Sequence, residues 1–203
     1  MLGRPGYRET SCGVLPDDWS VMPLSALLHD FRGGAPLRPD DFTRSGMKVL
    51  PKGGVGWRGY LDVAEEAFQY CSDAYAANHL RNIVDQTFTI VVLRDLVPSG
   101  PTIGLMVQIR GAATYLLAQG VYGFRVDERV AIPSYLVQLS QTRWYRRLVN
   151  GIMVGSTQVH ITNTAFNEAQ IPVPPLPEQN ASLVVLSGVD PLIGALDRLI
   201  AKK

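Results

Sequence analysis

Residues 155–161 read GSTQVHI, and residues 171–179, which begin ten positions after the first stretch ends, read IPVPPLPEQ. Glycine at 155 tolerates a positive φ, so a polar loop can turn sharply there after a helix. Thr162, Asn163 and Thr164 are residue types that cap helix N-termini, which predicts a short helix carrying Phe166. Prolines in the second stretch fix φ and remove backbone donors, so they predict an extended exit and exclude a helix or a central strand.

The polar loop presents hydroxyl, amide and imidazole groups at close spacing, on Ser156, Thr157, Gln158 and His160. Such a loop can contact a ligand, and it can equally be a capped turn without one, so the residues alone leave both interpretations open. The prolines resemble a ligand for a domain with an aromatic groove. An apolar helix follows them directly, which disfavours that interpretation.

Short apolar segments separated by turns make up the rest of the chain. Residues 87–93 (TFTIVVL) are β-branched and apolar throughout, which predicts a buried strand. Further strands are expected at residues 19–24, 47–50, 57–61, 103–109, 113–117 and 121–126. Helices are expected at 25–30, within 62–79, and from 132 to about 150, where Pro133 and Ser134 suit a helix start. The pattern predicts an α+β fold.

Composition places the chain among ordinary globular proteins, with 203 residues, 46% of them hydrophobic and 18% charged. No apolar run is long enough for a transmembrane helix, and residues 1–9 lack the apolar core of a signal peptide. We therefore expect no membrane association and a cytoplasmic location. The net charge of +1 is low for a nucleic-acid binder, but Lys and Arg are in excess in residues 1–60 and 101–160. A basic face is possible on that distribution.

Cysteine and histidine are too scattered to predict a metal site. Cys12 and Cys71 form no Cys-x-x-Cys pair, and the histidines lie at 29, 79 and 160. We interpret both cysteines as structural or incidental and expect no cofactor.

Several motifs in order along the chain resemble the target-recognition domain of the specificity subunit of type I restriction–modification systems. The resemblance includes residues 6–10 (GYRET) with 13–19 (GVLPDDW), residues 94–97 (RDLV), the helix from Tyr135 to Leu148, and the GSTQ loop with its proline-rich exit. Arginine at 94 departs from the family's usual glycine. The resemblance implies a fold of short irregular strands with flanking helices, followed by a C-terminal helical segment.

That resemblance also implies the organisation of the molecule. Residues 1–175 would form the DNA target-recognition domain and residues 176–203 a helical dimerisation or spacer segment. One domain suggests a half-subunit whose two copies pair as a homodimer, read a bipartite double-stranded DNA target and dock methyltransferase (modification) subunits. Apolar residues in the last segment recur in a heptad pattern at Leu186, Val189, Ile193, Leu196 and Ile200. A plain amphipathic helix docked on its own domain is the alternative.

Candidate DNA contacts fall into two groups. Cations in loop-rich sequence could bind phosphates or guanine, namely Arg38, Arg44, Lys48, Lys52 and Arg58, although solvated surface charge explains them equally. The resemblance favours the loop residues Thr157, Gln158 and His160. On the helix, Arg143, Arg146 and Arg147 are better explained as a solvated face or an intersubunit contact.

Catalytic motifs are missing from the sequence. The single Pro-Pro, at 174–175, lacks the Asn or Asp that a methyltransferase motif requires, and no acid precedes a lysine by two residues as in common nucleases. Catalysis is therefore expected from partner subunits. Two alternatives stay open: a protein-interaction or assembly module of the same fold that no longer reads DNA, and a small hydrolase using His160 with Ser156.

Overall fold

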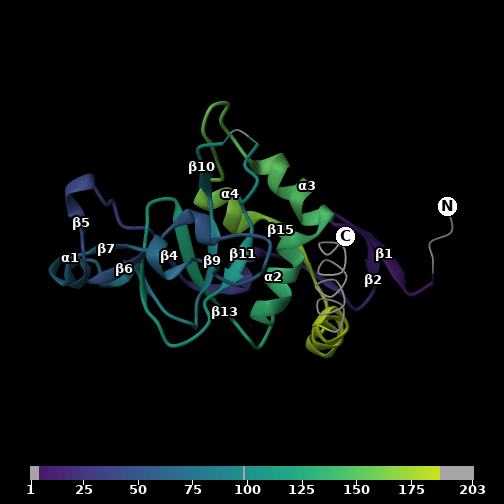
Figure 1. Cartoon of the computed structure of the whole chain (residues 1–203). Helices are drawn as coiled ribbons and strands as arrows, with labels where there is room; N and C mark the ends of the chain where they lie inside the picture. Colours follow the sequence, from purple (N-terminus) through teal and green to yellow (C-terminus); the bar gives the residue numbers. More distant parts are fainter. Residues whose placement is uncertain (1–4, 98, 188–203) are drawn as a thin grey trace, which may run out of the picture.

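A four-stranded antiparallel sheet forms the centre of the computed structural model, which describes residues 5–97 and 99–187 (Figure 1). Its strand order is β11-β9-β13-β4, with bounds β4 (Leu28–Gly33), β9 (Thr89–Val92), β11 (Met106–Gln108) and β13 (Val121–Val126). Every residue of β9 is buried, which confirms the strand expected there. Val91 packs into one hydrophobic cluster while Ile90 and Val92 pack into another. The strand is apolar on both faces because both faces of the sheet are covered.

A five-stranded sheet covers one end of the molecule, in the order β5-β7-β6-β12-β8. Its strands are β5 (Phe42–Thr43), β6 (Met47–Leu50), β7 (Gln69–Cys71), β8 (Ile83–Val84) and β12 (Tyr115–Leu117). β12 runs parallel to β6, and the other pairs are antiparallel. Helix α1 (Asp73–Asn78) follows β7 and is capped by the Ser72 hydroxyl, which accepts from the amide of Tyr75.

The single helix expected from 132 to about 150 is wrong. The structure has two helices, α2 (Pro133–Gln141) and α3 (Arg143–Ile152), separated by Thr142. Thr142 adopts φ −69° and ψ 149°, and its hydroxyl accepts from the amide of Tyr145, so it ends one helix and caps the next. Both helices pack on the central sheet, with Leu136 and Tyr145 in the core.

Two further expectations are also wrong. Residues 28–30, assigned to a helix, lie in β4 because the strand pairs with β13, and only a 3₁₀ turn (Leu24–Ala26) precedes it. Residues 57–61 form turns with one isolated bridge, Tyr60 to Gln108, and no strand. In the first case the pairing with β13 decides the structure. In the second case Gly59, with φ +73°, interrupts the extended backbone that a strand needs.

Three two-stranded ribbons complete the described fold. β1 (Tyr7–Thr10) pairs with β2 (Gly13–Pro16), β3 (Ser20–Pro23) with β15 (Gln170–Val173), and β10 (Arg94–Asp95) with β14 (Val159–His160). The short helix predicted after residue 162 is α4 (Asn163–Glu168), capped by Thr162. This helix carries Phe166, as predicted, and the side chain is buried in the core.

The C-terminal helix, of which residues 176–187 are described, begins at Leu176, with two residues between it and the end of β15. The prediction that the prolines exclude a helix from residues 171–179 is therefore wrong for residues 176–179. Gln179 is fully buried, and its side chain bonds three backbone groups of the domain. Glu178 accepts from Trp19 Nε1 at 2.9 Å. The start of this helix is therefore part of the domain's core. Leu186 is 41% exposed, and the other predicted heptad residues, Val189, Ile193, Leu196 and Ile200, lie outside the described residues.

A candidate nucleic-acid interface

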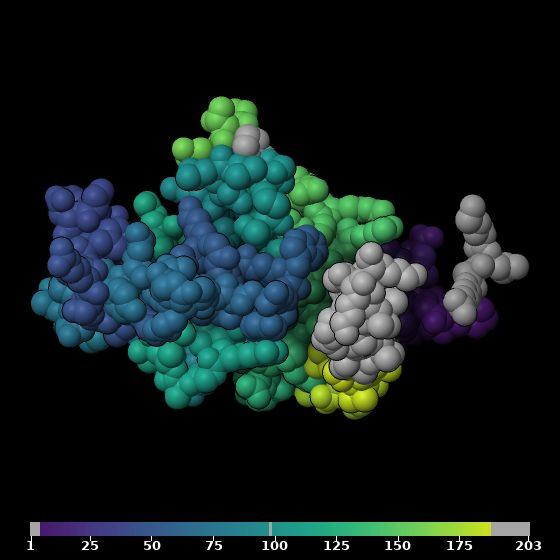
Figure 2. All heavy atoms as spheres, in the orientation of Figure 1, coloured from purple at the N-terminus to yellow at the C-terminus, as the bar shows by residue number. Residues whose placement is uncertain are grey.

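Two loops stand together at the apex of the molecule, at the top of Figures 1 and 2. One follows β10 and the other precedes β14, and the pairing of those strands sets Arg94 opposite His160 and Asp95 opposite Val159. Gly100, in the first loop, lies so close to the residues on either side of the second loop that a Cβ there would be 2.8 Å from Met153 Sδ and 3.3 Å from Val159 Cγ2. Segments about sixty residues apart in sequence thus form one structural unit, which we call the apical loops (residues 96–97 and 99–102 of the first, and 154–158 of the second).

The second apical loop is closed at its base and open at its tip. Val154 and His160 exchange two backbone hydrogen bonds, each 2.9 Å long. Gly155 has φ +108°, and a Cβ there would lie 2.1 Å from the carbonyl oxygen of Gln158, so only glycine fits. Thr157 and Gln158 are exposed, and no hydrogen bond of their side chains occurs within the described part of the chain. Their hydroxyl and amide groups are free to meet a ligand.

Positive charge flanks the apical loops. Lys52 and Arg94 both lie over Gly120: a Cβ at Gly120 would be 3.2 Å from Lys52 Nζ and 3.1 Å from Arg94 Cβ. Arg94 in turn pairs with His160 across β10 and β14. The structure therefore joins predicted site residues from two distant segments, Lys52 and His160, through an arginine that the sequence analysis did not select. The one sequence feature that could have indicated Arg94 is its position directly after the predicted buried strand at residues 87–93.

Arg146 holds the first apical loop from below. Its guanidinium donates to the carbonyls of Ile103, Gly100 and Pro101, the last two at 3.3 and 3.4 Å. Burial lowers the pKa of this arginine from its ordinary value. The expectation of a solvated or intersubunit role is wrong for Arg146, because α3 uses it to brace the loop. The exposed Arg143 and Arg147 keep the surface positions expected of them.

The remaining predicted cations lie elsewhere. Arg38 and Arg44 are exposed beside β5, at the end of the molecule that carries the five-stranded sheet. Lys48 pairs with Glu65 at 2.5 Å and lies 4.9 Å from the centroid of the Phe68 ring. Hydrogen bonding to Glu65 raises the pKa of Lys48. Arg58 pairs with Asp62 at 3.1 Å and lines a cleft beside the C-terminal helix.

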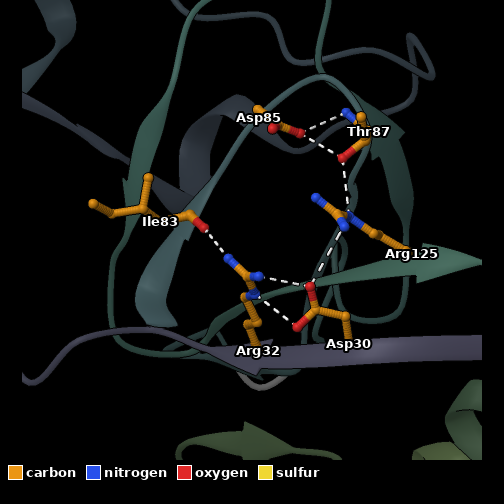
Figure 3. Close-up of polar contacts among 6 residues, drawn as sticks. All are labelled: Asp30, Arg32, Ile83, Asp85, Thr87 and Arg125. Atoms are coloured by element: carbon orange, nitrogen blue, oxygen red, sulfur yellow. Dashed lines mark hydrogen bonds and ion pairs between the residues drawn. The ribbon is translucent and has the colours of Figure 1, made fainter. Parts of the chain in front are cut away.

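A polar network ties β4 and β13 to the turn before β9, as Figure 3 shows; its side chains are Asp30, Arg32, Asp85, Thr87 and Arg125. Arg32 donates to both oxygens of Asp30, at 2.8 and 2.6 Å, and to the carbonyl of Ile83. Hydrogen bonds from Arg32 and Thr87 hold the pKa values of Asp30 and Asp85 below the ordinary range. These arginines serve the fold, so we do not assign them to DNA.

Neither a metal nor a hydrolytic centre is assembled in the part of the chain that the structure describes. Within residues 5–97 and 99–187, no three His, Cys, Asp or Glu side chains converge as metal ligands would. The same residues include no helix with the length and apolarity needed to cross a membrane. Over those residues the imidazole of His160 bonds no carboxylate, so the Ser156–His160 pair lacks the third group that orients a catalytic base.

Comparison with known proteins gives one consistent result. Residues 59–201 match the family model described as "Type I restriction modification DNA specificity domain". The MjaVIII specificity subunit of a type I restriction enzyme from Methanocaldococcus jannaschii is 22% identical over 188 residues, covering 92% of this chain and 43% of that protein. The MjaIX specificity subunit of the same organism is 25% identical, with 92% and 41% covered. The chain thus spans less than half the length of these relatives.

Solved structures confirm the α+β fold of short strands, helices and a C-terminal helix. The HsdS subunit from Thermoanaerobacter tengcongensis superposes with a TM-score of 0.65 at 14% identity, over 95% of this chain and 42% of that one. The S subunit of a type I system from M. genitalium gives a TM-score of 0.56 at 15% identity, over 90% and 41%.

Proposed function

This chain belongs to the type I restriction–modification DNA specificity domain family, and from that premise we propose that it reads one half of a bipartite double-stranded DNA target. The observation that carries the proposal is the apex, where Thr157 and Gln158 are exposed in the loop before β14. The strand β14 sets His160 opposite Arg94, and Arg94 and Lys52 both lie over Gly120. Amide and hydroxyl groups read base edges in the major groove, and cations bind phosphates. The domain supplies no catalytic group in this proposal, and methylation and cleavage belong to partner subunits.

Each apical residue has a distinct role in this proposal. The carboxamide of Gln158 pairs with adenine, for which glutamine can form two hydrogen bonds worth about 1–3 kcal/mol of discrimination. Thr157 donates its hydroxyl to a base edge or a phosphate. Lys52, Arg94 and His160 contact the backbone on either side and fix the register of the loop on the duplex.

Assembly forms the second part of the proposal. Two copies pair through the C-terminal helix and dock methyltransferase subunits in the cytoplasm. Its described portion supports a partner, because Val185 is 67% exposed and Leu186 41%, more than a helix docked only on its own domain needs. A two-fold dimer presents identical apices, so its target is an inverted repeat with an interruption.

Selection of bound sequences from a random duplex library tests the reading role. We expect the purified chain to enrich one half-site, or two inverted half-sites at fixed spacing if it pairs. Gln158→Ala should lose the preference at one base pair, whereas Gln69→Ala, an exposed glutamine on β7, should not. A library that shows no enrichment, with and without modification subunits, would overturn the proposal.

An interaction module without DNA reading is the second candidate, and the internal pairing of Lys48, Arg58 and Arg129 with carboxylates favours it. Salt dependence separates the two candidates. A reader with several phosphate contacts loses affinity steeply, with a slope in log salt of about −0.9 for each contact. An interaction module shows no binding to duplex from which a slope could be measured.

A further inference from the structure

A polar cleft of about 400 Å³ lies between the domain and the C-terminal helix. We call it the lateral cleft; the polar side chains among its described lining residues are Arg58, Gln108, Arg110, Ser134, Gln138, Asn180 and Ser187. No carboxylate is among its described lining residues. Two guanidinium groups and three carboxamides line the cleft, and such a set is rich in hydrogen-bond donors and positive charge, which suits an oxyanion.

Arg110 is held in a binding-competent orientation. Its guanidinium carbon lies 3.7 Å from the centroid of the Tyr60 ring, a stacked geometry that leaves the N–H groups at its edge. Within the described residues those N–H groups make no hydrogen bond to protein. The ring fixes the plane of the cation and leaves its donors for a ligand.

Arg58 and Gln108 are available for the same ligand. The ion pair between Arg58 and Asp62 is 3.1 Å long and its side chains are 67% and 53% exposed, so it is a weak surface contact that a phosphate can replace. Gln108 accepts from the Ser134 hydroxyl through Oε1 at 3.1 Å, which leaves its NH₂ group free to donate. The cleft thus offers unused donors from both sides.

Backbone hydrogen bonds hold the wall of the cleft that Gly59 and Gln108 form. The amide of Gln108 donates to the carbonyl of Gly59 at 3.1 Å, and the amide of Leu61 donates back to the carbonyl of Gln108 at 2.8 Å. Gly59 has φ +73° and sits against α2, where a Cβ would be 3.0 Å from Val137 Cγ1. A site built in advance loses little free energy in ordering when it binds.

The position of the lateral cleft relative to the apical loops indicates which oxyanion it binds. Arg146, which braces the first apical loop, also lies 5.7 Å from the centroid of the Trp57 ring. Trp57 is 54% exposed and precedes Arg58 in the chain. A connected surface therefore runs from the apical loops through Arg146 and Trp57 to the lateral cleft.

We propose that the lateral cleft binds a phosphodiester group of the duplex that the apical loops read. Arg58 and Arg110 supply the charge, and the amides of Gln108, Gln138 and Asn180 complete the set of donors. This inference rests on the proposed reading function and adds a sequence-independent anchor. Asn180 belongs to the C-terminal helix, so a phosphate held here also connects that helix to the DNA.

Binding measured over a salt series, with one random duplex and one selected duplex as probes, tests the anchor. Arg58→Gln and Arg110→Gln should each weaken both complexes by the same factor and reduce the salt slope by about 0.9. Arg110→Lys keeps the charge but loses the planar fork, and should restore the slope more than the affinity. Asp62→Asn releases Arg58 and should strengthen both complexes. Arg129→Gln, an arginine outside the cleft and the apical loops, is the matched control.

Failure of this inference differs from failure of the reading function. If the wild-type chain binds and selects duplex while the Arg58 and Arg110 variants keep its affinity and slope, the anchor is wrong and the reading function stands. If these variants change the selected sequence, the cleft reads bases and the phosphate assignment is overturned. Thermal unfolding of each variant shows whether it is folded, which both exposed positions should allow.

Discussion

The amide of Ile132 donates to the side-chain oxygen Oε1 of Gln179 at 2.8 Å. Ile132 is the N-cap residue of α2 and has no side-chain cap of its own, so a glutamine 47 residues away satisfies a backbone group that the helix leaves free. Nε2 of the same glutamine donates to the carbonyls of Pro174 and Val130, at 2.8 and 3.1 Å. One buried carboxamide thus joins the start of α2, the residue after β15 and the C-terminal helix.

Replacing Gln179 should destabilise the whole domain. Gln179→Leu keeps the volume but leaves an amide and two carbonyls buried without partners, at about 1–3 kcal/mol for each group left unsatisfied. Urea unfolding of the two proteins measures the loss, and Gln69→Leu on the surface of β7 serves as the control. A variant as stable as the wild type would show that these bonds contribute nothing net.

Two glycines close in sequence should respond to alanine in opposite ways. Gly155→Ala places a methyl group 2.1 Å from the carbonyl of Gln158 at φ +108°, so we expect a cost of about 1–3 kcal/mol and a displaced loop. Gly151→Ala lies in α3 with nothing within 4 Å, so it should stabilise the helix by about 0.5–1 kcal/mol. Thermal unfolding gives both values. Equal effects would contradict the strained geometry assigned to Gly155.

Removing the brace on the first apical loop should loosen that loop without unfolding the domain. Arg146→Met loses the hydrogen bonds to residues 100, 101 and 103 while its stem still packs. Hydrogen–deuterium exchange should speed up in residues 96–104, and Arg147→Met, its exposed neighbour, should leave exchange there unchanged. Unaltered exchange in the Arg146 variant would mean that the loop is held by its contacts with Met153 and Val159 instead.

Acid should weaken the fold through aspartates bonded to arginine. Hydrogen bonds from Arg129 lower the pKa of Asp127 from 3.8 to about 2. A carboxyl group with a lowered folded-state pKa contributes stability above its unfolded value and loses it as the pH falls through the folded value. Asp127→Asn should therefore flatten the decline between about pH 4 and pH 2 in urea titrations. A variant whose stability follows the wild-type profile would exclude Asp127 as a source of that decline.

Local sequence patterns predicted the elements whose burial is visible in one segment. The run at 87–93 gave β9, and Thr162 before Phe166 gave α4. The break at Thr142 could not be predicted from the apolar pattern, because buried residues recur in both helices. The two helices are separated by the cap geometry of Thr142. Residues 28–30 lie in a strand because that strand pairs with β13. The pairing partners of Leu28 and His29 are Val126 and Arg125, so no local pattern around residue 28 contains them.

Prediction of the candidate site was limited in the same way. Thr157, Gln158 and His160 could be selected because their loop is a contiguous motif. Arg94 and Lys52 reach that loop only through the β10–β14 pairing and the close approach at Gly120, which no short window contains. The lateral cleft draws on four segments, so the sequence revealed only its Arg58.

The buried carboxamide of Gln179 also determines how the C-terminal helix leaves the domain. Because Gln179, near the start of the helix, is bonded to the domain's core, no free linker separates the described part of the helix, residues 176–187, from the domain. Each residue of an α-helix advances 1.5 Å and turns by about 100°. In the proposed dimer, inserting one residue beyond Gln179 would therefore change the azimuth of the second copy as well as its distance. The distance between the two half-sites, and the rotation of one half-site about the DNA axis relative to the other, would then change together.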